Sequence, residues 1–279
     1  MEYLILEQRN SKKSKLPAQL DMMQSLTGLA LGAFIMAHIL FVSAILAGPA
    51  AAYWVDKMLE ASFLDPTGHG YPALTSLAAF VILVTFVIHA ALAVRKFPAS
   101  WKRYRILKDQ IDHLKHDETH LWWYQVQTGF ILFFAGSAHV ISMMFNPGQI
   151  GPFQAAQRYY THHMWIFYLI LLWAVVIHAS IGIYRALVKW GWLPGDVRRS
   201  RKVAQTLRRI FAVLYLIIGS LSIIFFVRLG MRLGDEPIRF EPFMQFHHQL
   251  MEKQMHHPMP EEAMPLPEGS EMPMPSQHP

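Results

Sequence analysis

Four histidines, His38, His89, His139 and His178, each lie inside a different long apolar segment of the sequence. An ionisable side chain at membrane depth is costly unless it is paired or ligated, so its presence there indicates a function. Four unrelated hydrogen bonds between helices are the alternative, but chance placement rarely puts one histidine into each of four segments. Imidazole nitrogens bind transition metals and haem iron, so the pattern predicts metal or haem chemistry inside a membrane.

Five apolar segments must position these side chains. Each approaches the length that crosses about 30 Å of hydrocarbon at about 1.5 Å per residue. Their approximate ranges are 26–47, 73–94, 121–145, 165–183 and 210–227, and the last contains no histidine. We therefore predict an all-α, polytopic membrane protein with five transmembrane helices.

Three parts of the chain differ in composition. Residues 1–20 form a polar N-terminal segment, residues 21–233 a membrane domain, and residues 234–279 a tail rich in Met, Pro, His and Glu. Residues 51–63 between the first two spans predict a short amphipathic helix on the membrane surface. The tail could bind a metal through Met and His, or drape over a partner.

Composition excludes several classes of protein. With 53% hydrophobic and 16% charged residues among 279, the chain is too apolar for an ordinary soluble domain. The chain has no cysteine, which rules out thiolate ligation of an iron-sulfur cluster and covalent haem attachment. The net charge of +6 comes from loops between spans, so it does not indicate nucleic-acid binding.

The basic residues also predict the orientation. Of the 25 Lys and Arg residues, 19 fall in the N-terminal segment, the second-to-third loop and the fourth-to-fifth connection. The positive-inside rule places these segments, and the N-terminus, in the cytoplasm and the C-terminus outside.

Histidine depth predicts two pairs. Counting from the cytoplasmic span ends, His38, His89, His139 and His178 lie roughly 18, 12, 27 and 20 Å deep. This order pairs His89 with His178 at a shallow site and His38 with His139 at a deeper one. Paired imidazoles within a four-helix bundle suit low-spin haem iron, so we expect two haems b.

The segments DMMQSLTG, HAALAVRKFP, LWWYQVQTGF and HASIGIYRALVKWGW carry a family resemblance. Over about residues 12–233 the chain resembles the dihaem cytochrome b subunit of quinol:fumarate reductases and related succinate:quinone reductases. The resemblance implies the same histidine pairing. In that family one haem is proximal, near the cytoplasm, and the other is distal, near the outer face. The resemblance assigns propionate contacts at the proximal haem to Gln24, Ser25, Trp122 and Lys189, and at the distal haem to Arg158.

For proton chemistry the resemblance points to Glu60, which matches a glutamate that the family uses at its menaquinol site. From sequence alone Asp56, Asp65 and His69 are competing groups. The implied function is oxidation of menaquinol to menaquinone near the outer face of a bacterial inner membrane, with the C-terminus in the periplasm. Electrons would pass through the distal and then the proximal haem.

The partners implied are an iron-sulfur subunit, docked on the basic segment 95–115, a flavoprotein subunit that reduces fumarate, the lipid bilayer, and a dimer of heterotrimers. Two alternatives stay open. One is the succinate:menaquinone reductase direction. The other is a non-redox protein that binds or transports a metal through its histidines and tail.

One position departs from the family. Two residues before the fourth ligand, dihaem fumarate reductases typically carry a glutamate that relays protons, and this chain has Val176. Either another relay serves, with Tyr168, Ser180 and Tyr184 as candidates, or turnover is electrogenic, or the enzyme prefers succinate oxidation.

Overall fold

A computed structural model describes residues 15–97, 100–114 and 117–233, and every element in those ranges is helical. The tail, and most of the N-terminal segment, lie outside the described residues, so their predicted roles stay predictions. The elements are α2 (Leu16–Val42), η1 (Ser43–Ala47), α3 (Pro49–Leu59), η2 (Ser62–Leu64), α4 (Pro72–Val94), α5 (Trp101–Leu114), α6 (Asp117–Phe145), η3 (Pro147–Gln149), α7 (Pro152–Tyr160), α8 (Trp165–Trp190) and α9 (Val197–Leu233).

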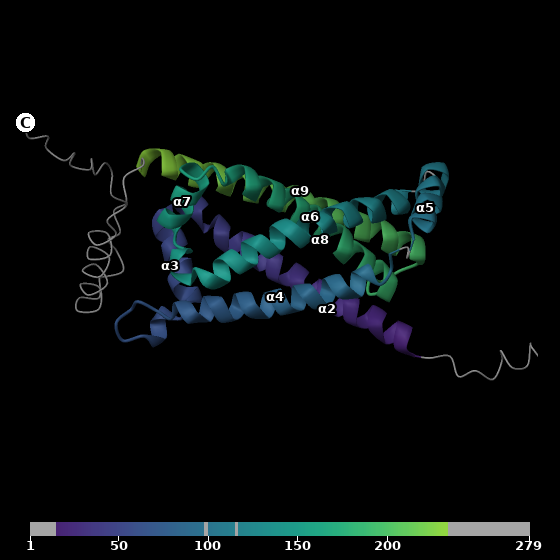
Figure 1. Cartoon of the computed structure of the whole chain (residues 1–279), viewed down its shortest axis with the longest axis horizontal. Coiled ribbons are helices and arrows are strands. Elements are labelled where there is room, and N and C mark those ends of the chain that lie inside the picture. The colour runs from purple at the N-terminus through teal and green to yellow at the C-terminus, as the bar shows by residue number, and fades with distance from the viewer. Residues whose placement is uncertain (1–14, 98–99, 115–116, 234–279) are drawn as a thin grey trace, which may run out of the picture. The chain divides into compact units, whose positions relative to one another are not determined.

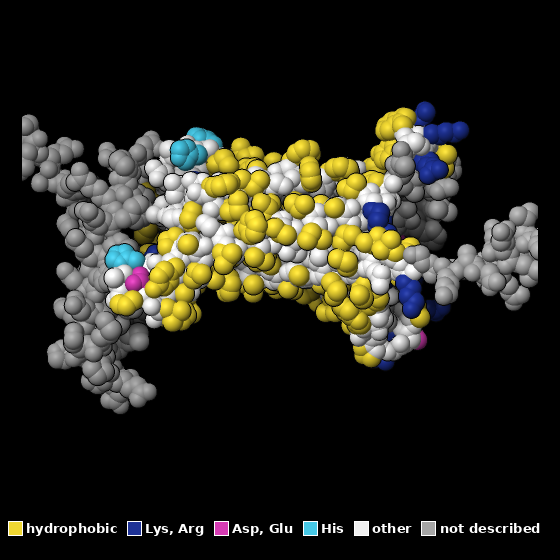
Figure 2. All heavy atoms as spheres, turned by 60° about the horizontal axis from the view of Figure 1, so that its bottom comes forward, with side chains coloured by type: hydrophobic (Ala, Val, Ile, Leu, Met, Phe, Trp, Pro, Cys, Tyr) yellow, Lys and Arg dark blue, Asp and Glu magenta, His cyan; other side chains and the backbone are white. Residues whose placement is uncertain are grey.

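Five of the described helices, α2, α4, α6, α8 and α9, are long and apolar enough to cross a membrane, as predicted. They run alongside one another in Figure 1 and present an apolar band to the outside in Figure 2. Exposed apolar side chains over such a length are expected where lipid is the solvent.

Local sequence explains where the helices begin and end. Gly48, at φ +114°, stops the first span, and Pro49 then occupies the first turn of α3, where a missing N–H costs nothing. Pro72 and Pro152 open α4 and α7 in the same way. Gly191 ends α8 in the left-handed region, where a side chain would be strained.

Two helices extend beyond the predicted apolar segments. The first begins at Leu16 instead of residue 26, and the last takes in much of the basic connection and spans Val197–Leu233. The polar turns continue the helix because their residues are good helix formers, and hydropathy alone does not show this. The predicted helix at residues 51–63 is present as α3, with bounds Pro49–Leu59, and its place on the membrane surface stays a prediction. Helix α7 in the third-to-fourth connection was not predicted.

The bundle has two chemically different ends. We call the end with the start of α2, the end of α4, α5 and the α8–α9 turn the basic end, because Lys and Arg gather there in Figure 2. The opposite end, with α3, η2 and α7, we call the α3 end. Helix α6 packs against α4 on one side and α8 on the other, and α2 contacts both α4 and α8. Four helices therefore surround one interior.

Candidate functional site

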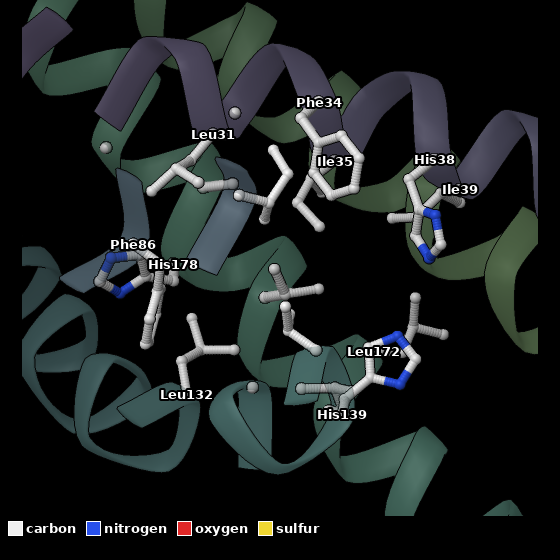
Figure 3. Close-up of a pocket in the computed structure, with 18 of the residues that line it drawn as sticks. Leu31, Phe34, Ile35, His38, Ile39, Phe86, Leu132, His139, Leu172 and His178 are labelled. Carbon is white, nitrogen blue, oxygen red and sulfur yellow. The ribbon is translucent and has the colours of Figure 1, made fainter. Parts of the chain in front are cut away.

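The four histidines of the membrane helices meet in two pairs. The rings of His38 on α2 and His139 on α6 have centroids 6.2 Å apart. Those of His89 on α4 and His178 on α8 are 6.4 Å apart. His89 is close to the end of α4, so its pair lies nearer the basic end. In Figure 3, apolar side chains lie between His178 and the pair of His38 and His139.

The spacing of each pair fits two axial ligands on one metal ion. An imidazole nitrogen lies about 2 Å from a first-row metal ion, and the ring centroid roughly 1 Å further back, so two opposed ligating rings have centroids about 6 Å apart. Among the described residues, no three His, Asp or Glu side chains come together to hold a metal ion. Two protein ligands at each site leave the remaining coordination positions to a planar group such as a porphyrin.

Hydrogen bonds fix the rings of the His89–His178 pair. His178 Nδ1 lies 2.9 Å from the carbonyl oxygen of Gln125. Thr27 Oγ1 lies 3.2 Å from His89 Nδ1, and the backbone of Gln24 hydrogen-bonds the same side chain. A ring that donates from Nδ1 to a carbonyl keeps the lone pair of Nε2 free for a metal ion, and this is a common arrangement of metal-binding histidines.

The other pair is set in a more apolar environment. His38 stacks on Phe34, with centroids 5.4 Å apart, and Tyr168 meets the ring of His139 edge-on at 5.6 Å. His139 Nδ1 is buried without a hydrogen-bond partner. A buried polar atom left unpaired is uncommon, and it indicates a ring that is held by another interaction.

All four histidines line a single cavity of about 1180 Å³. Small-molecule pockets are usually about 300–1,000 Å³, so this one exceeds the space that a single small ligand needs. Glycines keep parts of its wall flat. A Cβ on Gly28 would lie 2.8 Å from His89 Cε1, and one on Gly129 would lie 3.2 Å from His178 Cε1. The cavity thus fits bulky flat groups held between facing imidazoles.

At the basic end, the side chains predicted to bind a propionate come together on the cavity wall. They are Gln24, Ser25, Trp122 and Lys189. Gln24 Oε1 is buried without a hydrogen-bond partner, whereas Ser25 Oγ donates to the carbonyl of Asp21 at 3.0 Å. The structure therefore gathers these residues, and their role toward a propionate stays a prediction.

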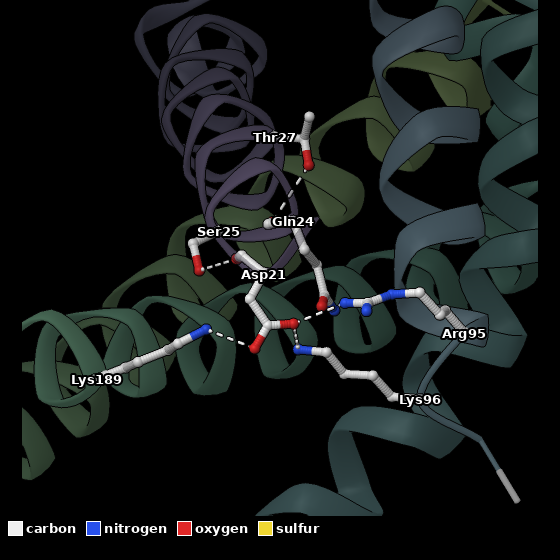
Figure 4. A network of polar contacts seen from close by, with 7 residues as sticks. All are labelled: Asp21, Gln24, Ser25, Thr27, Arg95, Lys96 and Lys189. Carbon is white, nitrogen blue, oxygen red and sulfur yellow. Dashed lines mark hydrogen bonds and ion pairs between the residues drawn. The ribbon is translucent and has the colours of Figure 1, made fainter. Parts of the chain in front are cut away.

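Sequence reasoning missed the carboxylate beside them. Asp21 on α2 accepts from Arg95 at 2.7 Å and from Lys96 at 3.0 Å at the end of α4, and from Lys189 on α8 at 3.3 Å. Figure 4 shows three cations converging on one acid. No local spacing in the sequence predicts this cluster, because its members come from three helices that are distant in the chain.

At the α3 end, Arg158 lines the cavity from α7, the short helix that precedes the fourth span. Its Nη1 donates to the carbonyl of Gln149, and its Nε is buried without a partner. A guanidinium whose buried Nε has no hydrogen-bond partner is suited to an anionic group in the cavity.

Glu60 and Asp56 sit differently on α3. Glu60 is 2% exposed and does not line the cavity, because its Oε2 lies 2.6 Å from Lys57 Nζ and Gly70 packs over its side chain. Asp56 does line the cavity. Burial, and then the negative charge of Glu60, raise the pKa of the Asp56 carboxyl to about 7. The other competing groups, Asp65 and His69, are in the loop that follows and do not line the cavity.

Val176 is fully buried in an apolar cluster of α2, α7, α8 and α9. Of the polar candidates near it, Ser180 donates to the carbonyl of Ile177 at 2.9 Å, and Tyr184 donates to Glu118 at the basic end. Tyr168 lies on the other side of Val176, about two turns earlier in α8. Leu172 and Val176, both buried, separate it from Ser180 and leave an apolar gap.

Comparisons with known proteins agree with this geometry. Residues 102–218 match the family described as succinate dehydrogenase/fumarate reductase transmembrane subunit. The chain is 40% identical over 233 residues to the fumarate reductase cytochrome b subunit of Wolinella succinogenes, covering 83% of this chain and 90% of that protein. It is 41% identical over 204 residues to the protein of the same name from Helicobacter pylori strain 26695, covering 73% and 79%.

The structure is a bundle of membrane-length helices that brings histidines together in pairs, and its relatives are about 40% identical over most of both chains. The chain therefore belongs to the succinate dehydrogenase/fumarate reductase transmembrane subunit family and is a cytochrome b membrane anchor.

Proposed function

We propose that this chain holds two b-type haems, oxidises menaquinol near the α3 end and delivers the electrons to an iron-sulfur subunit at the basic end. The observation that carries the proposal is the presence of two histidine pairs, 6.2 and 6.4 Å across, in one cavity. Two haems held there would supply one-electron carriers between the two ends of the bundle. Fumarate would be reduced on a flavoprotein subunit of the same complex.

The protein groups have separate roles in this proposal. His38 with His139 would hold the iron of one haem, and His89 with His178 would hold the iron of the other. Gln24, Ser25, Trp122 and Lys189 bind propionates at the basic end, and Arg158 binds one at the α3 end. These residues all line the same cavity, which supports the assignment. The basic segment 95–115 faces the iron-sulfur subunit, on the cytoplasmic side by the positive-inside rule.

Glu60 is the proposed proton acceptor for menaquinol oxidation. Quinol oxidation releases two protons for two electrons, so the site needs a basic group within reach of a proton path. Glu60 is buried beside the cavity wall, and its ion pair with Lys57 keeps a carboxylate stable out of water.

Two measurements test the proposal. The visible spectrum and haem content of the purified complex should show two low-spin haems b for each copy of this chain. Glu60→Gln should abolish fumarate reduction driven by menaquinol and leave fumarate reduction by a reduced viologen intact, because viologen bypasses the quinol site. A colourless chain that binds copper or nickel would support the non-redox alternative instead.

The succinate:menaquinone direction is the second candidate, and the apolar gap at Val176 favours it. Moving one charge against 100 mV costs about 2.3 kcal/mol unless a proton moves with it. With no proton relay through the gap, electrons moving outward from a cytoplasmic iron-sulfur subunit would be helped by the membrane potential, and electrons moving inward would be opposed. Turnover in energised and uncoupled vesicles, measured in both directions, separates the two candidates.

A further inference from the structure

Two carboxyl groups of α3 face different surroundings. Ala52, Val55, Asp56 and Leu59, spaced three and four residues apart, form one face of α3, and all four line the cavity. Glu60 lies on the neighbouring face, under the loop that leads to α4. Asp56 is therefore the carboxyl on α3 that a molecule in the cavity meets.

Glu60 is covered and already paired. Lys57 Nζ lies 2.6 Å from Glu60 Oε2 and 2.9 Å from the carbonyl of His69. The amide of Tyr71 donates to the Glu60 carbonyl at 2.7 Å, and a Cβ on Gly70 would lie 2.9 Å from Glu60 Cβ. A quinol in the cavity would have to displace this loop to reach the Glu60 carboxylate directly.

Asp56 lines the cavity and lies four residues, about one helical turn, before Glu60. Lys57 and Glu60 are the charged groups that influence it, both on α3, and Tyr53 is the nearby phenol on the same helix. Toward α7, its carboxyl lies near the residue before that helix, since a Cβ on Gly151 would lie 3.8 Å from Asp56 Oδ2. The charged residue of α7 is Arg158, which lines the same cavity. Burial and the charge of Glu60 outweigh the attraction of Lys57 and raise the pKa of Asp56, so its carboxylate is a good proton acceptor for a group in the cavity.

We propose that the Asp56 carboxylate accepts a hydroxyl proton of menaquinol in the cavity and passes it to Glu60, which releases it through the Lys57–His69 side. The inference rests on the proposed quinol oxidation at this end of the bundle. In each transfer a quinol O–H bond breaks, an Asp56 O–H bond forms, and the proton then moves to Glu60. Two such transfers remove both protons of menaquinol. Its two electrons would pass to the haems, which leaves menaquinone.

The pKa of Asp56 supports this order. Burial and Glu60 raise it to about 7, so near neutral pH the group is partly ionised and can both take and give up a proton. Below that pH Asp56 is mostly protonated and cannot accept a proton from menaquinol. The rate of quinol oxidation should therefore rise as the pH increases through about 7.

The test uses the whole complex and compares two donors, a menaquinol analogue and a reduced viologen. Asp56→Asn should lower menaquinol-driven fumarate reduction by a factor of about 10² to 10⁴, the usual contribution of a general base, and remove the rise with pH. Viologen-driven turnover and haem content should stay at the wild-type level. Asn should not impair folding, because burial already disfavours the charged form of Asp56. Asp56→Glu should restore part of the quinol-driven rate.

Asp65→Asn is the matched control. Asp65 is in the same connection but outside the cavity, and its oxygens accept from Thr67 and Gly70, which an Asn oxygen can replace in part. It should keep quinol-driven turnover. If Asp56→Asn keeps both the rate and the pH profile while Glu60→Gln is inactive, this inference is wrong and the proposed quinol site stands. If both variants turn over menaquinol normally, the proposed quinol site itself is wrong.

Discussion

Gly28 on α2 is the position where the smallest change should have the largest effect on haem binding. A Cβ there would lie 2.8 Å from His89 Cε1, whereas ordinary contact begins at 3.4 Å, so Gly28→Ala forces a shift of about 0.6 Å. The imidazole cannot retreat freely, because its Nδ1 is held on α2 by Thr27 and Gln24. A displacement of that size is roughly a third of a metal–nitrogen bond of about 2 Å.

The same substitution at an open position should be harmless. Gly148 in η3 has no atom within 4 Å of the position that a Cβ would take, and it does not line the cavity, so Ala fits there. Overpacking at Gly28 should instead cost about 1–3 kcal/mol.

Haem content for each chain and the low-spin spectrum of purified protein measure the outcome. Gly28→Ala should lose or shift the haem of the His89–His178 pair and leave the other, whereas Gly148→Ala should resemble wild type. If Gly28→Ala keeps both haems with unaltered spectra, the ring of His89 is not constrained as the structure indicates, and the assignment of this pair as rigid ligands is refuted.

Three further predictions concern other parts of the chain. His139→Ala should remove one haem and keep the spectrum of the other in protein that still inserts at normal yield; retention of both haems would contradict the pairing. Menaquinol-driven fumarate reduction in sealed liposomes should generate a membrane potential, and Val176→Glu should decrease it, whereas electroneutral turnover by wild type would show a relay elsewhere. Asp21→Asn should lower the thermal midpoint slightly, because exposed ion pairs contribute about 0–1 kcal/mol each, and the difference should vanish near 1 M salt, where charges are screened within about 3 Å.

The spans and histidine pairs could be predicted because each depends on a local pattern. A long apolar segment defines a membrane helix, and the rise per residue converts the position of His89 or His178 into a depth. Helices that cross in opposite directions then leave few ways to pair four side chains. The structure pairs the rings of His38 with His139 and of His89 with His178, as predicted.

Other features needed the three-dimensional arrangement. The partners of Asp21 come from α4 and α8, so no local pattern could identify them. The sequence placed Asp56 and Glu60 on one short helix, but which of them faces the cavity depends on the rotation of α3 and on the loop that carries Gly70. Helix α7 was missed because it is short and polar and gives no hydropathy signal.

The packing of α4 has a consequence for how the protein is made. Among the membrane helices it is the one that buries no residue, and it contacts mainly α2 and α6. It nevertheless carries His89, so a bond from this histidine to a cofactor would join α4 to α8, a helix far along the chain. Insertion of the cofactor would then hold α4 in the bundle as well as supply the electron carrier. We expect that cells starved of haem degrade this chain quickly, and that proteolysis starts at the connections on either side of α4.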